Sequence, residues 1–168
     1  MNIVLTGFMA SGKTQISKEL AKLLGYKLID TDEVIEKEKN MSINDIFQTE
    51  GEAGFRKIEH SVVCRVSKLS DTVISTGGGV VLNPKNITAL RQGGVIVSLA
   101  PSFDVIIERL GEARDTRPLL KDSDLDSIKK RFNDRLPYYD NCDFKIEVSN
   151  DYTPKHYAEE IAKMLKLI

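Results

Sequence analysis

The chain has 168 residues, of which 24 are basic and 25 acidic, and 41% are hydrophobic. A chain of this length buries about two-thirds of its unfolded surface, so residues 1–168 are expected to fold as one domain without a disulfide framework. The net charge of -1 excludes the basic surface of a general nucleic-acid binder or a polybasic membrane binder. Two cysteines, no apolar run of membrane-spanning length and no basic leader predict a cytoplasmic protein.

The first half of the chain alternates short β-branched runs with helical periodicity. Residues 3–5 and 27–29 are predicted strands, and the helix between them should end at Gly25, because glycine suits the left-handed position after a helix. A short polar helix is expected over residues 33–39. Ser42 then has the position of an N-cap for another helix. A longer helix is expected to follow it, with Phe55, Ile58, Val62, Val66 and Leu69 on its apolar stripe.

The second half continues this alternation. Its predicted strands are residues 72–75, 95–99 and 144–148, and its predicted helices begin near residues 84, 102, 125 and 154. The helix that begins near residue 125 should end before Pro137, because proline has no backbone N–H and restricts the residue before it. Residues 111–124 show no apolar period and have the length of a mobile lid.

Strands separated by helices imply right-handed parallel crossovers and a sheet that is covered on both faces. The fold class is therefore predicted as α/β, in the form of a three-layer α/β/α sandwich with a parallel five-stranded sheet. Ligands of such sheets collect at the carboxyl ends of the strands. We therefore expect the functional residues in the segments that directly follow the strands.

The phosphate-binding pattern G-x-x-x-x-G-K-[ST] is present at Gly7–Thr14, between a predicted strand and a predicted helix. Backbone N–H groups at the start of such a helix converge on a phosphate, which the helix dipole also favours. Lys13 would neutralise β- and γ-phosphate oxygens, and Thr14 would offer its hydroxyl to Mg²⁺. Nucleoside triphosphate contacts are expected from Ala10, Ser11, Gly12, Lys13, Thr14 and Gln15.

Two aspartates flank Thr31 directly after the second predicted strand. On an extended segment this spacing places the Asp30 and Asp32 carboxylates on the same side. One of them can then hold a magnesium-bound water while the other accepts the proton of an acceptor hydroxyl. The alternative is that Asp32 caps the helix predicted to begin at Glu33.

Three glycines, Gly77–Gly79, follow the third predicted strand. They form either a flexible turn or a backbone that lies flat against a ligand, and their place directly after a β-branched strand favours the second. Arg56 either pairs with Glu52 or Glu59 on its own helix or joins Arg135 in binding a small carboxylate with guanidinium forks. The alternative role of Arg135 is to stabilise the end of its helix.

Six segments occur in the order and approximate spacing of shikimate kinases: Gly7–Thr14, Asp30–Asp32, Gly51–Glu59, Gly77–Gly79, Arg117–Leu120 and Arg135–Tyr139. The chain therefore resembles the shikimate kinase family of P-loop small-molecule kinases over nearly its whole length. The resemblance implies ATP- and Mg²⁺-dependent phosphorylation of the 3-hydroxyl of shikimate, on the route to chorismate and the aromatic amino acids. It also implies a monomer with no nucleic-acid or membrane partner.

The resemblance assigns a role to each candidate residue. The implied catalytic residues are Asp32 as the base, Lys13 and the lid residue Arg117. Thr14 would ligate Mg²⁺, with Asp30 in its outer shell. The implied shikimate contacts, drawn from a helical region at residues 32–62 and from later motifs, are Asp32, Arg56, Gly78, Gly79 and Arg135. The implied ATP contacts outside the phosphate loop are Arg109, which would stack on adenine, and Arg117.

Two positions in the phosphate loop depart from the family pattern. Ala10 replaces a glycine, and Gln15 replaces a serine or threonine. A side chain at position 10 costs up to about 1 kcal/mol if the backbone there has a positive φ.

Two alternative functions share some of these features. Gluconate kinases and nucleoside monophosphate kinases also have a phosphate loop and a lid. A regulatory nucleotide-binding module without catalysis would share the phosphate loop, but it would have no use for a base such as Asp32 or a lid arginine such as Arg117.

Overall fold

The computed structural model describes the backbone of residues 1–114 and 122–168, and the side chains of residues 1–111 and 124–168. The strands are β1 (Asn2–Thr6), β2 (Lys27–Asp30), β3 (Thr72–Ser75), β4 (Gly94–Pro101) and β5 (Phe144–Val148). The helices are α1 (Lys13–Leu24), α2 (Thr31–Lys39), α3 (Ile43–Val66), the short 3₁₀ helix η1 (Val80–Leu82), α4 (Pro84–Gly93), α5 (Phe103–Arg114), α6 (Asp122–Tyr139) and α7 (Pro154–Met164). None of the helices described here is long and apolar enough to span a membrane.

The five strands form one parallel sheet in the order β2-β3-β1-β4-β5. The predicted α/β class with a parallel five-stranded sheet is therefore confirmed. The order places β2, β3 and β1 side by side, with Leu5 of β1 in register with Ser75 of β3, and Asp30 of β2 also in register with Ser75. Because parallel strands end at the same edge, the phosphate loop, the aspartates and the three glycines all meet there.

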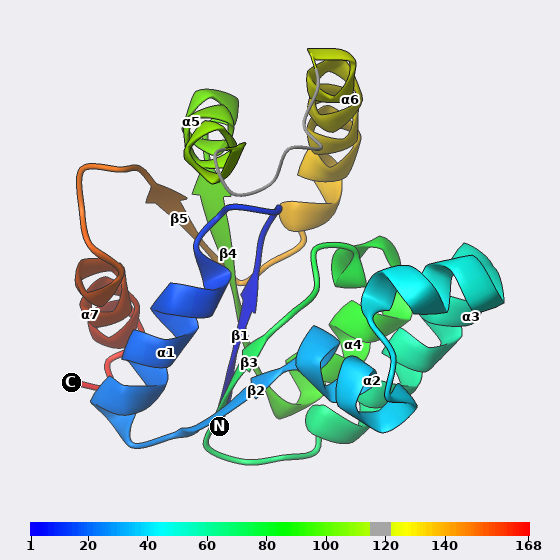
Figure 1. The fold of residues 1–168 in the computed structure, drawn as a ribbon. Coiled ribbons are helices and arrows are strands. Elements are labelled where there is room, and N and C mark those ends of the chain that lie inside the picture. Colours follow the sequence, from blue (N-terminus) through cyan, green and yellow to red (C-terminus); the bar gives the residue numbers. More distant parts are fainter. Residues whose placement is uncertain (115–121) are drawn as a thin grey trace.

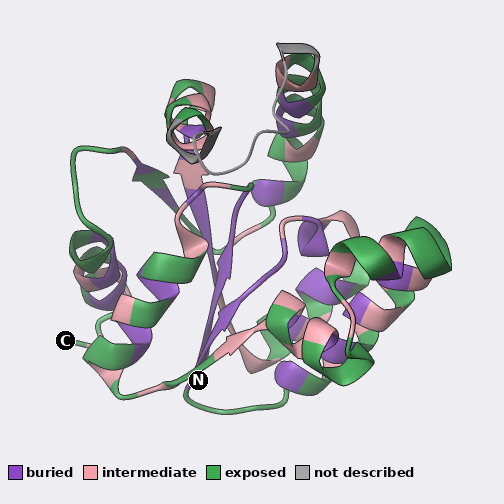
Figure 2. Cartoon of the chain, viewed as in Figure 1, coloured by how far each residue is buried: buried purple, intermediate pink, exposed green. Residues whose placement is uncertain are grey.

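Helices cover both faces of the sheet, as predicted. Figure 1 shows α1 and α7 on one side of the strands and α3 and α4 on the other. The first core packs Leu5 of β1 against Leu20 of α1 and Ile161 of α7, and the second packs Val4 against helices that include α3 and α4. The central strands are the most deeply buried part of the chain (Figure 2).

Local capping signals define most helix ends where the sequence predicts them. Gly25 ends α1 with φ 67°, and the Ser42 hydroxyl accepts from the N–H of Asp45 at the start of α3. Asn83 and Thr153 cap α4 and α7 in the same way, each followed by a proline at the first helical position. Gly51, with φ 72° and ψ 177°, breaks the helical path within α3.

Four predicted helix boundaries are wrong. Helix α2 begins at Thr31 rather than Glu33, so Thr31 and Asp32 lie in a helix and not on an extended segment. Helix α6 continues through Pro137 to Tyr139 although the proline offers no backbone N–H to the helix. Helices α5 and α6 extend into residues 111–114 and 122–124 of the predicted lid, and the rest of that prediction falls on 115–121, outside the described residues.

Candidate active site

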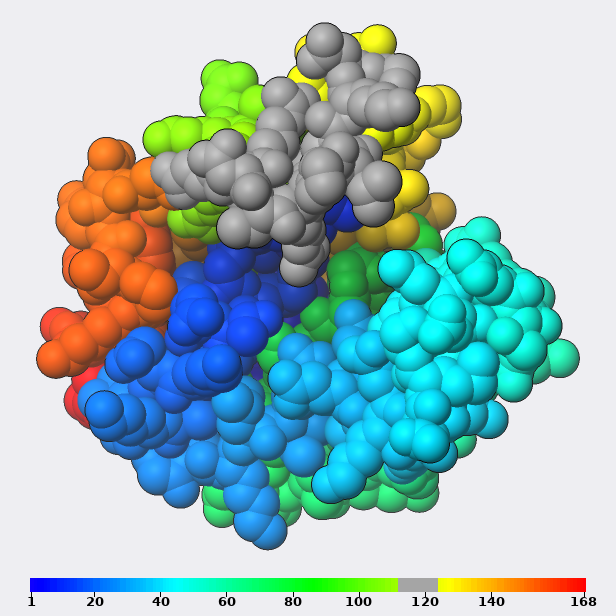
Figure 3. Space-filling view, in the orientation of Figure 1, coloured from blue at the N-terminus to red at the C-terminus, as the bar shows by residue number. Residues whose placement is uncertain are grey.

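A cavity of about 630 Å³ opens at the carboxyl edge of β2, β3 and β1. Figure 3 looks onto this face, which is hollowed between the blue residues of the phosphate loop and α1 and the cyan residues of α3. Twelve predicted site residues line the cavity: Ala10, Ser11, Gly12, Lys13, Thr14, Gln15, Asp30, Asp32, Arg56, Gly78, Gly79 and Arg135. Arg117 lies outside the described residues. A larger groove of about 880 Å³, lined by residues of α5, β5 and α7, contains none of these twelve residues.

The phosphate loop is held in a conformation with two left-handed residues. Gly12 has φ 95° directly before α1, and Ala10 has φ 60°. The predicted strain at position 10 is therefore present, and it costs about 1 kcal/mol for a residue with a side chain. Arg109 braces the loop, because its Nη1 donates to the Ala10 carbonyl at 2.8 Å while its Nη2 donates to the Ser149 carbonyl at 3.2 Å.

Lys13 lies folded over the loop that carries it. Its Nζ donates to the carbonyl oxygens of Gly7 at 2.5 Å and Phe8 at 3.1 Å. Burial lowers the pKa of Lys13 to about 8, while the nearby carboxylates of Asp32 and Asp30 oppose that shift. An anionic phosphate beside the ammonium would stabilise its charged form, so phosphate binding and protonation of this lysine are coupled.

The two aspartates have different local roles. Asp30 caps α2, because its Oδ1 accepts from the N–H groups of Asp32 at 2.9 Å and Glu33 at 3.2 Å. The interpretation of Asp32 as the cap is therefore wrong. Thr31 lies between them with its side chain fully buried, and its hydroxyl accepts from the N–H of Gly77 at 3.0 Å.

The Asp32 carboxylate is free of capping bonds and turns towards the cavity and the glycines. Burial raises the pKa of Asp32, and Asp30 raises it further, whereas Lys13 lowers it. A carboxylate in this setting is a better proton acceptor than an exposed one, because its proton affinity is higher. The position and the electrostatics of Asp32 therefore suit a general base.

Arg56 projects from α3 into the cavity and is held by acidic partners. Its Nη1 lies 2.8 Å from Oε1 of Glu59, which is 1% exposed, and its Nη2 lies 3.8 Å from Oε1 of the exposed Glu52. The guanidinium also lies 5.2 Å from the ring centroid of Phe55. Burial raises the pKa of Glu59, and Arg56 counteracts this. The predicted pairing with Glu52 and Glu59 is present, and it coexists with a place in the cavity wall.

Arg135 reaches the cavity from α6, whereas Arg56 reaches it from α3. It is not at the helix end, because α6 continues to Tyr139, so the predicted alternative of stabilising the helix terminus is wrong. Its guanidinium lies 6.0 Å from the ring centroid of Phe8. Arg135 is close enough to Glu59 to lower the pKa of that carboxyl group. The two guanidinium groups therefore share one electrostatic environment, as a site for a small carboxylate requires.

Each of the three glycines faces a different functional side chain. A Cβ added to Gly77 would lie 2.6 Å from Oδ1 of Asp32, and one added to Gly79 would overlap the guanidinium of Arg56. A Cβ added to Gly78 would lie 3.5 Å from Nη1 of Arg135, an ordinary contact. Side chains at Gly77 and Gly79 would therefore displace the Asp32 carboxylate and the Arg56 guanidinium.

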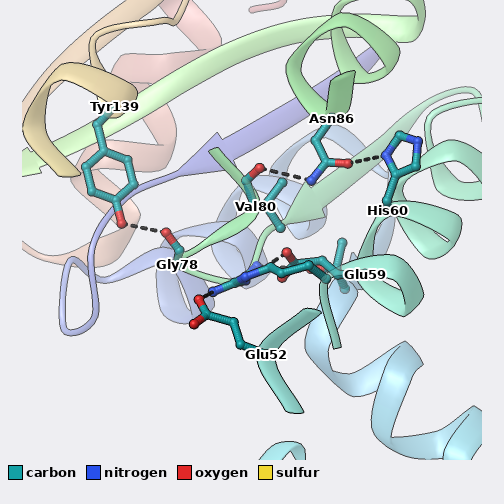
Figure 4. Close-up of polar contacts among 10 residues, drawn as sticks. Glu52, Glu59, His60, Gly78, Val80, Asn86 and Tyr139 are labelled. Carbon is teal, nitrogen blue, oxygen red and sulfur yellow. Dashed lines mark hydrogen bonds and ion pairs between the residues drawn. The ribbon is translucent and has the colours of Figure 1, made fainter. Parts of the chain in front are cut away.

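Tyr139 does not line the cavity, but it binds the glycine backbone that does, a role that the sequence did not predict. Its hydroxyl donates to the Gly78 carbonyl at 2.6 Å, and its side chain is 6% exposed (Figure 4). Burial raises the pKa of Tyr139, while Arg135 beside it lowers that pKa. The position of a tyrosine four residues after Arg135 on one helix face is the only sequence signal that links it to the site.

Comparison with known protein families and sequences points to one enzyme family. The family model for shikimate kinase matches residues 9–166. A shikimate kinase of Caldicellulosiruptor bescii is 52% identical over 161 residues, which are 95% of this chain and 92% of the relative. A shikimate kinase of Thermoanaerobacter pseudethanolicus is 43% identical over 96% of this chain and 94% of the relative.

Solved structures show the same similarity over the whole fold. Shikimate kinase from Acinetobacter baumannii in complex with shikimate has a TM-score of 0.88 and 29% identity, and the match covers 99% of this chain and 93% of that one. Shikimate kinase from Bacteroides thetaiotaomicron has a TM-score of 0.89 and 30% identity, with 99% and 98% covered. The resemblance deduced from the sequence motifs is confirmed, and neither alternative function is supported.

Proposed function

The chain belongs to the shikimate kinase family, and we propose that its cavity binds Mg²⁺-ATP and shikimate and transfers the γ-phosphoryl group to the 3-hydroxyl. One observation carries this proposal. The half-buried carboxylate of Asp32 lies between the phosphate loop and two arginines from different helices. Such a cavity can bind phosphates beside Lys13 and the carboxylate of a compact polyol between the two guanidinium groups. The Asp32 carboxylate is then available as a base.

The arginines would bind the shikimate carboxylate. Arg56 and Arg135 enter the cavity from α3 and α6, and a carboxylate between them can accept hydrogen bonds from both planar forks. The backbone of Gly78 and Gly79 forms the wall between the two arginines. This arrangement fixes the acid group of shikimate and thereby the direction in which its ring hydroxyls point.

Asp32 would take the proton as the new bond forms. The 3-hydroxyl oxygen attacks the γ-phosphorus, the bond from the γ-phosphorus to the β,γ-bridging oxygen breaks, ADP leaves, and the hydroxyl proton moves to the Asp32 carboxylate. Lys13 neutralises charge on the transferred group, and we propose that Arg117, which lies outside the described residues, adds to this. Most of the acceleration in such a reaction comes from positioning and charge neutralisation.

The residues at the phosphate end fit a magnesium ion. Mg²⁺ prefers oxygen donors and is often bound by one or two protein groups together with nucleotide phosphates. Thr14 supplies a hydroxyl and Asp30 a carboxylate, and both line the cavity beside the phosphate loop. When bound, the ion would neutralise charge on the phosphates. We also propose that Arg109, which already contacts the loop, stacks on adenine.

The proposal is tested by coupled measurement of ADP release from purified protein with ATP and Mg²⁺. Shikimate should stimulate release, whereas gluconate and nucleoside monophosphates should leave it at the level without acceptor. Arg56→Lys should raise the KM for shikimate about tenfold or more, because an ammonium cannot form the planar fork. ADP release that does not depend on shikimate, or that is faster with gluconate, would refute the substrate assignment.

We propose in addition that the enzyme acts as a cytoplasmic monomer. Twelve of the predicted contacts line one cavity within a single chain, so the described part of the site needs no second copy. Activity per chain that stays constant over a wide range of protein concentration, together with a monomer mass in sedimentation, is the expected result.

A further inference from the structure

The backbone of Gly77–Gly79 has no side chains of its own with which to fix its position. It is held instead by side chains that bind its peptide groups and those of the next residue. Thr31 accepts from the Gly77 N–H at 3.0 Å, and Tyr139 donates to the Gly78 carbonyl at 2.6 Å. These two anchors come from α2 and α6, the helices that carry Asp32 and Arg135.

A third anchor comes from α4, none of whose described residues lines the cavity. Asn86 Nδ2 donates to the Val80 carbonyl at 3.0 Å, and both residues are buried, with 1% and 0% of their surface exposed. Val80 follows Gly79 directly, and its own N–H returns to the Gly77 carbonyl at 3.1 Å. Holding Val80 therefore holds both ends of the glycine segment.

The side chain of Asn86 is oriented in turn by His60 on α3. His60 Nδ1 lies 2.6 Å from Asn86 Oδ1. Because the Val80 carbonyl can only accept, the Asn86 amide group must direct its NH₂ to Val80 and its oxygen to His60. His60 must then carry a proton on Nδ1, which leaves Nε2 facing Cys64 Sγ at 3.5 Å. Figure 4 shows Asn86 and His60 on one side of Val80, and Glu52 and Glu59 on the other.

The position of the glycine backbone determines where the guanidinium groups of Arg56 and Arg135 lie. Arg56 packs so closely against Gly79 that no Cβ would fit between them, and Arg135 lies within ordinary contact distance of a Cβ at Gly78. A shift of the glycine backbone would therefore displace the Arg56 guanidinium, because the guanidinium would either follow the backbone or be pushed away by it. Because a misplacement of about 1 Å can cost on the order of a hundredfold in rate, a remote hydrogen bond that prevents the shift has a functional effect.

We infer that Asn86, oriented by His60, is a positioning residue for shikimate binding. It acts through the Val80 carbonyl and the glycine segment on Arg56, without touching the substrate. This inference rests on the proposed function, because it takes Arg56 and Arg135 as the groups that bind the shikimate carboxylate.

The test compares Asn86→Ala, Asn86→Asp, His60→Phe and His60→Gln in the full chain. Asn86→Ala removes the donor to Val80, and Asn86→Asp keeps an acceptor for His60 but has no NH₂. Both should raise the KM for shikimate about tenfold and leave the KM for ATP within about twofold. His60→Phe should have a smaller effect in the same direction, and His60→Gln, which keeps a donor, should restore most of the affinity.

The control is Ile161→Val on α7, which is fully buried in the core on the other face of the sheet. It lowers the melting temperature without touching the glycine segment, so both KM values should stay unchanged. If Asn86→Ala and Ile161→Val change the KM for shikimate equally, or if the Asn86 variants raise both KM values together, the inference is wrong. His60→Phe, at a half-buried position, measures the same link if Asn86→Ala does not fold.

Arg56→Lys, measured in parallel, distinguishes a failure of the proposed carboxylate site from a failure of the positioning role of Asn86. A raised KM for shikimate in Arg56→Lys with unchanged values in all Asn86 and His60 variants overturns the positioning role alone. An unchanged KM in Arg56→Lys overturns the proposed carboxylate site. Equilibrium binding of shikimate by calorimetry, which should weaken in Asn86→Ala by the same factor as KM, provides a readout that does not depend on turnover.

Discussion

Replacements of the two aspartates at the carboxyl end of β2 should differ in their effects on stability and catalysis. The Asp30 carboxylate accepts two backbone N–H groups at 2.9 and 3.2 Å and caps α2. The Asp32 carboxylate makes no such bond and lies against Gly77 beside the cavity. Asp30→Ala should therefore destabilise the fold in addition to weakening Mg²⁺ binding, whereas Asp32→Asn should abolish phosphoryl transfer without destabilising the fold.

The size of each effect follows from these contacts. Loss of an N-cap costs about 1 kcal/mol, which for a chain of this size lowers Tm by about 2–4 °C. Asp32→Asn should leave Tm unchanged or raise it, because burial raises the Asp32 pKa and thus makes the ionised form unfavourable in the folded protein. Loss of a general base should lower kcat by about 10²–10⁴-fold.

The pH dependence of stability gives a second measurement of the same difference. Between the ordinary pKa of 3.8 and the raised pKa of Asp32, the folded protein binds more protons than the unfolded chain. The free energy of unfolding of the wild type should therefore fall, relative to that of Asp32→Asn, as pH rises through this window.

Thermal melts, ADP release and ATP binding of both variants test this prediction. ATP should bind Asp32→Asn with nearly wild-type affinity, which shows that the phosphate loop is intact. An Asp32→Asn protein that melts several degrees lower and still phosphorylates shikimate would refute the assignment of Asp32 as the base.

Three further predictions follow from the same cavity. Gly79→Ala should raise the KM for shikimate with little change in Tm, because the added methyl group displaces the Arg56 guanidinium. Gly78→Ala adds only an ordinary contact and should raise this KM less, so equal KM values for the two variants would contradict the steric argument. The KM for ATP should rise about tenfold from pH 7 to pH 9 as Lys13 loses its proton near pH 8, and Lys13→Arg should flatten that profile. Ala10→Gly should relieve a φ of 60° and leave Tm unchanged or higher by up to about 3 °C, so a clear fall in Tm would show that the strain is absent.

The fold could be predicted from the sequence because its signals are local. Alternating β-branched runs and helical periodicity define the strands to within a residue or two. Gly25, Ser42, Asn83 and Thr153 mark helix ends through bonds to neighbouring residues. The phosphate loop was equally accessible, since its pattern and its position between a strand and a helix are both properties of one short segment.

Boundaries set by distant contacts could not be predicted in the same way. The helix after β2 begins at Thr31, whose hydroxyl accepts from the N–H of Gly77, a residue 46 positions later. In α6, the turn that contains Pro137 ends with Tyr139, whose hydroxyl is bound to Gly78 from 61 positions away. Both errors occur where a side chain near a helix end binds the glycine segment. These contacts join residues 46 and 61 positions apart, so a local sequence pattern cannot reveal them.

The different roles of the two aspartates follow from the residue at which α2 begins. If α2 began at Glu33, Asp32 would be the residue placed to cap it, and the carboxylate would turn back to its own helix. In the structure α2 begins two residues earlier, with Asp30 as its cap and Thr31 bound to Gly77, so the Asp32 carboxylate turns towards the cavity instead. The glycine segment limits where this carboxylate can lie, since Gly77 leaves room for Asp32 only while it lacks a side chain.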